Sequence, residues 1–149
     1  MSPVLFFRQV ERVGVLCTVD AEPAAAHAAP AADRLCDAAR AVLASLLGAD
    51  GPPVLTLTPN DERIADPATL VVLLHAQTRT AAVPGAADAA VTALAATLHR
   101  SRPDLGAPPF FLTPPEAVVA AGGPAPPDTV DGALRRLLAG VARPLRANP

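Results

Sequence analysis

The sequence predicts a small α+β domain in which a largely antiparallel β-sheet carries two helices packed on one face. The stretch 67–80 is the most hydrophobic run of the chain and is typical of a central strand. Strand-like segments precede and follow it, and the segments 33–47 and 129–143 repeat apolar residues at helical spacing. Because 149 residues is the size of one ordinary domain, we expect a single domain over 1–149.

Segments rich in alanine and proline separate these elements. Proline lacks a backbone N–H and interrupts regular structure, so we expect connections at 21–32, 103–109 and 122–127. Alanine occurs 34 times, aromatic residues make up only 3% of the chain, and lysine is absent. The core is therefore expected to consist of leucine, valine and alanine.

The first strand and the first helix follow from two different periodicities. Over 8–20, valines and Cys17 alternate with more polar residues, which predicts a strand. Over 33–47 the apolar residues recur at helical spacing, with Asp33 at or near the N-terminal capping position and Gly48 closing the helix in a left-handed conformation. This stripe is wide enough for a helix that lies flat on a sheet.

A short strand at 54–58 leads to the central stretch 67–80, whose two faces differ. One face is wholly apolar, whereas the other begins apolar and turns polar at His75. At 14 residues this stretch is too short to span a bilayer as a helix, so we expect no membrane span. The apolar face is expected to lie beneath the two helices; it consists of Leu70, Val72, Leu74 and Ala76.

The segment 88–102 is compatible with two structures. Its apolar residues fit a helix at one spacing and a strand at another. We favour a strand that returns along the central strand, because the turn at 83–87 is tight and Thr92 and Thr97 are interspersed. A helix here would instead give a β-α-β-β-α-β order.

The C-terminal third predicts short extended pieces at 110–112 and 117–120, which prolines confine to an edge of the sheet. The last helix begins at Asp128 as its cap and is expected to stop at Pro144.

Several classes of chemistry are excluded or disfavoured. Without lysine the chain cannot form a lysine Schiff base or a standard phosphate-loop lysine contact. The carboxylates of 60–66 lack the spacing of a calcium loop, and we expect no metal and no cofactor. A net charge of -2 with few aromatic residues argues against nucleic-acid binding. No stretch matches a family signature.

The two cysteines bear on the cellular compartment. Cys17 on the first strand and Cys36 on the first helix are both expected to face the layer between sheet and helix. They can form one disulfide in an oxidising compartment or remain buried thiols in the cytosol. The apolar run before Arg8 is too short for a secretory signal, so our default is the cytoplasm, with the periplasm as the alternative.

Two hypotheses about function remain. The first is a non-catalytic interaction or assembly domain whose partner is another protein or a second copy of the chain. The second is a small enzyme or anion-binding protein, in which arginines hold a carboxylate or phosphate and a histidine moves a proton. We favour a protein that is not an enzyme. The second hypothesis requires both histidines and at least two arginines in one pocket; its residues are His75, Arg79, His99, Arg100 and Arg102.

Overall fold

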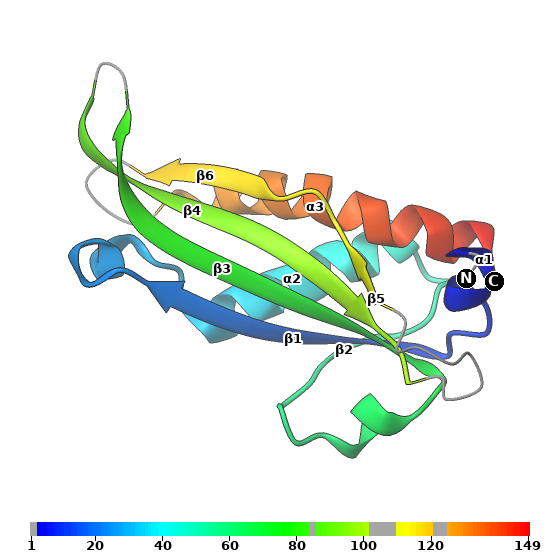
Figure 1. Cartoon of the computed structure of the whole chain (residues 1–149). Helices are drawn as coiled ribbons and strands as arrows, with labels where there is room; N and C mark the ends of the chain where they lie inside the picture. The colour runs from blue at the N-terminus through cyan, green and yellow to red at the C-terminus, as the bar shows by residue number, and fades with distance from the viewer. Residues whose placement is uncertain (1–2, 84–85, 102–109, 121–124) are drawn as a thin grey trace.

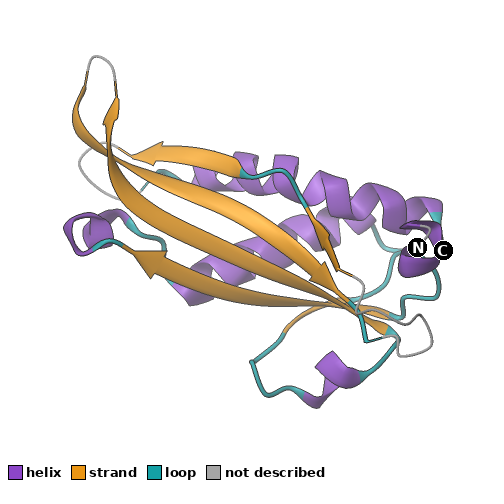
Figure 2. Ribbon diagram, in the orientation of Figure 1, coloured by secondary structure: helices purple, strands orange, loops and turns teal. Residues whose placement is uncertain are grey.

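The computed structural model describes residues 3–83, 86–101, 110–120 and 125–149, and its fold is α+β (Figures 1 and 2). The predicted fold class is therefore confirmed, with two long helices on one face of a sheet. The strands are β1 (Arg12–Ala21), β2 (Val54–Thr56), β3 (Thr69–Val83), β4 (Ala86–His99), β5 (Phe110–Leu112) and β6 (Glu116–Ala120). The α-helices are α1 (Pro3–Phe7), α2 (Ala32–Leu47) and α3 (Pro127–Ala147), and the 3₁₀ turns are η1 (Pro23–Ala28) and η2 (Glu62–Ala65).

The sheet is organised around β3. Its strand order is β2-β1-β3-β4-β5, with β6 also pairing with β4. The central position of the 67–80 stretch is thus confirmed, and so is the strand favoured over 88–102, since β4 runs antiparallel to β3. The two short extended pieces near the C-terminus pair with β4, as expected of edge strands.

The sheet is mixed and not purely antiparallel, although three of its five strand pairings are antiparallel. β1 pairs in parallel with both β2 and β3. The physical reason is α2, which follows β1 in the chain and returns the backbone to the end where β1 began, so that the next strands run in the same direction. Apolar alternation shows which residues share a face, but it carries no information on strand direction.

The core lies between the sheet and the two long helices. The apolar face of β3 is closed, since Leu70, Val72, Leu74 and Ala76 are each at most 1% exposed. α2 and α3 run side by side in the same direction (Figure 1). At their C-terminal ends, Arg146 Nη1 donates to the carbonyl of Leu46 at 3.2 Å.

Helix α1 was not predicted, and it changes the composition of the core. Phe6 and Phe7 are 0% and 5% exposed and meet edge to face, with ring centroids 5.1 Å apart. The core therefore contains aromatic side chains as well as leucine, valine and alanine. The helix ends at Phe7, and in the turn that follows it Gln9 adopts a positive φ of 58°.

The ends of the long helices match the predictions in part. Gly48 closes α2 with a φ of 79°, as expected. Asp33 and Asp128 lie within the first turns, while the capping positions belong to Ala31 and Pro126, without a side-chain cap. Pro144 does not stop α3: the helix lacks an N–H at this residue but continues to Ala147, and its last turn buries Leu145.

The connections contain more structure than expected where they are described. η1 lies within 21–32, and its Ala25 and Ala28 are buried against Ala90 of β4 and Ala120 of β6. The connection 103–109 lies outside the described residues, as do residues 122–124 of the third connection. Among the described residues, no helix is long and apolar enough to cross a membrane.

Candidate functional site

The proposed histidine and arginine cluster is not assembled. On the ladder between β3 and β4, His99 lies opposite Val71, so His75 lies four positions further along the sheet. Arg79 lies four positions beyond His75. At about 3.3 Å per residue, each step of four separates the side chains by about 13 Å. These three residues are spread along one strand direction, and Arg102 lies outside the described residues.

Arg100 has a structural role instead. Its side chain is 2% exposed, and Nε donates to the carbonyl of Pro67 at 2.6 Å. Nη1 donates to the carbonyls of Phe6 at 2.7 Å and Arg8 at 2.6 Å, and Nη2 donates to that of Gln9 at 3.0 Å. These carbonyls stand at the end of α1, where no further helical turn supplies a donor. The guanidinium therefore fastens α1 to the body of the domain.

His75 takes part in contacts between β1 and β3. Its Nδ1 lies 2.7 Å from the hydroxyl of Thr18, and its Nε2 lies 3.7 Å from a carboxylate oxygen of Asp20. A hydroxyl, an imidazole and a carboxylate in contact resemble the parts of a nucleophilic triad. However, His75 and Asp20 are 46% and 73% exposed, and the carboxylate is too far away to orient the ring by a hydrogen bond. The group is a solvated surface contact.

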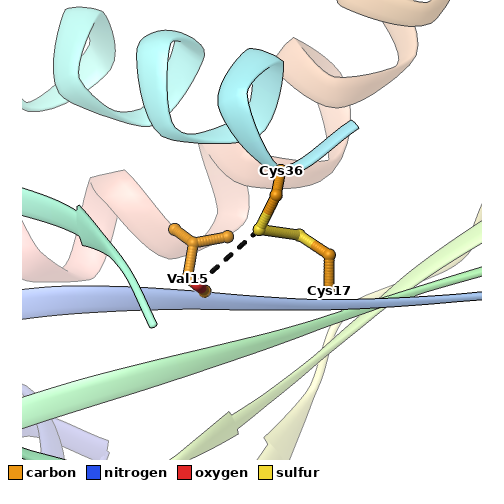
Figure 3. Close-up of a disulfide and its surroundings, with 3 residues drawn as sticks. All are labelled: Val15, Cys17 and Cys36. Atoms are coloured by element: carbon orange, nitrogen blue, oxygen red, sulfur yellow. Dashed lines mark hydrogen bonds between the residues drawn. A yellow bond between two sulfur atoms is a disulfide. The ribbon is translucent and has the colours of Figure 1, made fainter. Parts of the chain in front are cut away.

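The two cysteines are brought together. A disulfide joins Cys17 of β1 to Cys36 of α2, with the Cα atoms 5.6 Å apart (Figure 3). This separation lies within the range in which a bridge forms without backbone movement. Sγ of Cys36 also lies 3.6 Å from the carbonyl oxygen of Val15, to which it can donate only as a reduced thiol. The bridge fixes α2 to β1, the strand that it covers.

A cleft of about 390 Å³ opens where the N-terminal ends of α2 and α3 meet the sheet. Its charged lining residues are Arg34 and Asp131, one of each sign, and the hydroxyl of Thr92 is already bonded to that of Thr78 at 2.7 Å. The rest of the described lining is apolar, and none of the proposed cluster residues belongs to it. A second hollow, of about 540 Å³, is lined by Arg100 without either histidine.

Metal binding finds no support in the part of the chain that the structure describes. Within the ranges 3–83, 86–101, 110–120 and 125–149, no group of three histidine, cysteine, aspartate or glutamate side chains is placed to hold an ion. Two carboxylates of the η2 loop are engaged with arginines instead, Asp61 with Arg63 and Asp66 with Arg12.

Among the described residues, no α-helix lies on the second face of the sheet (Figure 2). One end of it is covered by the loop that follows β2, where Leu57 lies against Gly14 and leaves no room for a side chain there. Beyond that loop the face is open, and we call this part the open face. Its described residues are Leu16, Thr18, Asp20, Leu73, His75, Gln77, Arg79, Val91, Ala93, Ala95, Thr97, Ala117 and Val119.

The sheet also has two unpaired edges among the described residues. β2 pairs with β1 only over Val13–Val15, so the outer side of Leu16–Ala21 has no neighbouring strand. We call this stretch the β1 edge. On the opposite side, β6 pairs only with β4, and we call its outer side the β6 edge. Sequence reasoning missed both edges, because they depend on strand order, which the apolar pattern does not encode.

Comparison with known proteins gives information on the fold of the chain and none on a functional site. No protein-family model matches the chain, and no curated protein sequence matches it. The PelC dodecamer from Paraburkholderia phytofirmans is similar in structure, with 17% identity, 92% of this chain and 89% of that chain covered, and a TM-score of 0.51. A PelC variant from the same organism gives 15% identity, coverage of 93% and 90%, and a TM-score of 0.53.

A third similar structure is the hypothetical protein CT253 from Chlamydia trachomatis. It shows 13% identity, coverage of 93% of this chain and 99% of that chain, and a TM-score of 0.51. At these identities the likeness concerns the arrangement of helices and strands, so the chain shares its fold with PelC and CT253.

Proposed function

We propose that this protein is a non-catalytic assembly subunit that associates with further copies of itself. The observation that carries the proposal is the open face of the sheet, on which apolar side chains outnumber charged ones. A sheet face that bears leucine, valine and alanine gains stability when a partner covers it. Val119 on this face is 52% exposed, an unusual exposure for a valine in an ordered strand.

Within the described part of the chain no reactive group is assembled, and this supports the same proposal. Arg100 is occupied by backbone carbonyls, and His75 lies on the surface away from the apolar cleft. PelC, which has the same fold, is described as a dodecamer, and this supports self-association as a use to which the fold can be put.

We further propose that the protein works in an oxidising compartment, with the periplasm in place of the cytoplasmic default. The disulfide between Cys17 and Cys36 supports this, because such bridges persist outside the cytosol and are rare within it. Mass spectrometry of protein from its native host, alkylated after denaturation without reduction, tests the compartment. Finding both thiols alkylated would contradict it.

Self-association is tested by measuring the mass of the purified, oxidised protein by native mass spectrometry and light scattering over a range of concentrations. We expect a defined species whose mass is a multiple of 15.1 kDa. A single 15.1 kDa species at every concentration would contradict the proposal.

A further inference from the structure

We propose that copies of the chain join through the β1 edge of one copy and the β6 edge of the next, in a parallel ladder that continues the sheet. The inference rests on the proposed self-association and adds a contact between the edges of neighbouring copies to the one made through the open face. It follows from the backbone groups that each edge presents, from the strand directions, and from the side chains beside the edges.

The β1 edge presents hydrogen-bonding groups at every second residue. The N–H of Val13 donates outward to Pro53 at 2.9 Å, and the carbonyl of Val15 accepts outward from Leu57 at 2.8 Å. Since backbone groups alternate along a strand, Cys17 and Val19 also direct their N–H and C=O outward. Beyond Val15 no described strand receives them.

The β6 edge offers the complementary set. The N–H of Thr113 donates to the carbonyl of Ala96 at 3.0 Å, which shows that the even-numbered residues of β4 direct their backbone groups toward β5 and β6. Their partners on β6 are Glu116, Val118 and Ala120, and these bond back to β4. Ala117 and Val119 therefore direct their N–H and C=O away from the sheet.

Strand directions determine how the two edges meet. β1 runs parallel to β3, β3 runs antiparallel to β4, and β4 runs antiparallel to β6, so β1 and β6 run in the same direction. A sheet that continues from copy to copy therefore pairs them in parallel. α2 and α3 cover the same face, so α3 of one copy comes to lie beside α2 of the next.

The two edges are different surfaces of the chain, so the contact between copies is heterologous. Such contacts repeat from copy to copy and produce a closed ring or an open filament, according to the rotation at each step. The right-handed twist between neighbouring strands supplies a rotation of constant sign at each junction.

Neither edge carries the structural features that usually prevent an edge strand from pairing with another chain. Natural edge strands are often protected by lysine, proline or a bulge. Along the β1 edge the charged side chain is Asp20, which already contacts His75. On β6 it is Glu116, which accepts a hydrogen bond from Nε of Arg136 at 3.0 Å. Asp20 lies on the open face and Glu116 on the helix-covered face, so the ladder does not set these two carboxylates directly beside each other.

The inference is tested by cross-linking engineered cysteines on the open face. The chain has no free cysteine among its described residues while the native bridge is intact. Three variants are compared: Asp20→Cys, Val119→Cys, and the chain with both substitutions. Within one chain the two positions are three strand spacings apart, about 14 Å, so a bis-maleimide of shorter span cannot join them internally.

The heterologous contact predicts a distinctive pattern on a denaturing gel. The double variant should give a ladder of covalent multimers, each single variant alone should remain monomeric, and a mixture of the two single variants should give dimers. Dimers from Asp20→Cys alone would indicate a two-fold contact between β1 edges and would overturn the inference.

The same samples separate this inference from the proposal on which it rests. If native mass spectrometry shows oligomers and the double variant gives no ladder, the contact lies elsewhere and the self-association proposal stands. If all variants are monomeric by both methods, both proposals fail.

A second variant tests the backbone groups directly. Val119→Pro removes one outward N–H without removing a bond to β4, and edge strands tolerate proline. Val119→Thr is the matched control, because it keeps the backbone N–H and the shape of the side chain. We expect Val119→Pro to raise the protein concentration needed for assembly at least tenfold, whereas the control assembles like the parent. Equal assembly of both variants, with unchanged circular dichroism, would exclude the β6 edge.

Discussion

Two neighbouring residues of β3 show how differently the two faces of the sheet are used. Leu74 is 1% exposed beneath the helices, whereas Leu73 is half-buried on the open face. Both are leucines of one strand that lies between β1 and β4. Burial beneath the helices is therefore confined to one face of this strand, and the other face remains partly exposed.

The largest expected effect comes from placing a charge on each face in turn. Leu74→Asp would bury an unpaired carboxylate and should cost several kcal/mol, comparable to the stability of an ordinary domain of about 5–15 kcal/mol. Leu73→Asp places the same charge on the open face and should change the free energy of unfolding of the isolated subunit by less than about 1 kcal/mol. Urea unfolding measures both.

Similar melting of the Leu74→Asp variant and the parent would show that the helices do not close this face. A large loss of unfolding free energy in Leu73→Asp, measured at concentrations where the protein is monomeric, would show that the open face also contributes to the stability of the domain.

The next largest effect concerns Arg100, at the end of the covered face. Arg100→Ala would leave the buried carbonyls of Phe6 and Pro67 without this donor and should cost about 3 kcal/mol. Arg79→Ala, on the open face, removes an exposed arginine of the same strand pair and serves as the control, with an expected change within about 0.5 kcal/mol. Chemical denaturation with circular dichroism distinguishes them. Equal effects would mean that the hydrogen bonds of Arg100 contribute nothing to stability.

The disulfide links α2, which covers one face of the sheet, to Cys17 on the β1 edge. Replacing both Cys17 and Cys36 by alanine removes a bridge between residues 19 apart and should lower the free energy of unfolding by about 3 kcal/mol. Adding a reductant to the parent should produce a similar loss, while the double variant should not respond to it. A parent insensitive to reductant in unfolding experiments would contradict the bridge.

The smallest effect is a pH dependence at the covered end of the second face. Arg63 donates from Nε and Nη2 to the carboxylate of Asp61 at 2.9 and 2.7 Å, and this lowers the pKa of Asp61 from 3.8 to about 2. Because the pKa is lower in the folded state, the contribution to stability is complete above pH 3.8 and is lost as the pH falls toward 2.

This dependence is checked by melting temperatures between pH 2 and pH 5. The parent should lose stability more steeply than Asp61→Asn, which cannot titrate at that position. Identical slopes would show that the contact with Arg63 does not persist in solution.

The parts of the fold that could be predicted are those encoded in local periodicity. The apolar stripe of α2 with Gly48 at its end, and the apolar face of β3, are visible in the sequence and present in the structure. Helix α1 could not be found, because five residues make too short a pattern and its stability comes from Arg100, more than 90 residues away in the chain.

The candidate site was less predictable than the fold. The sequence pattern suggested that His75 and His99 lie toward the polar ends of consecutive strands and meet in space. In the structure His75 lies in the middle of β3, and His99 is the last residue of β4. The actual register places them four positions apart on one face, and only the pairing of β3 with β4 reveals this. The open edges could not be inferred either, since they require the order of the strands.

The position of the disulfide in the chain has a consequence for the time course of folding. Cys17 and Cys36 are separated by 19 residues, and both precede the central strand, which begins at Thr69. A chain that enters an oxidising compartment from its N-terminus therefore presents both thiols before the main sheet can form. Once closed, the bridge holds β1 beside α2 as a preformed unit, and β3 needs only to add along a strand that is already in place.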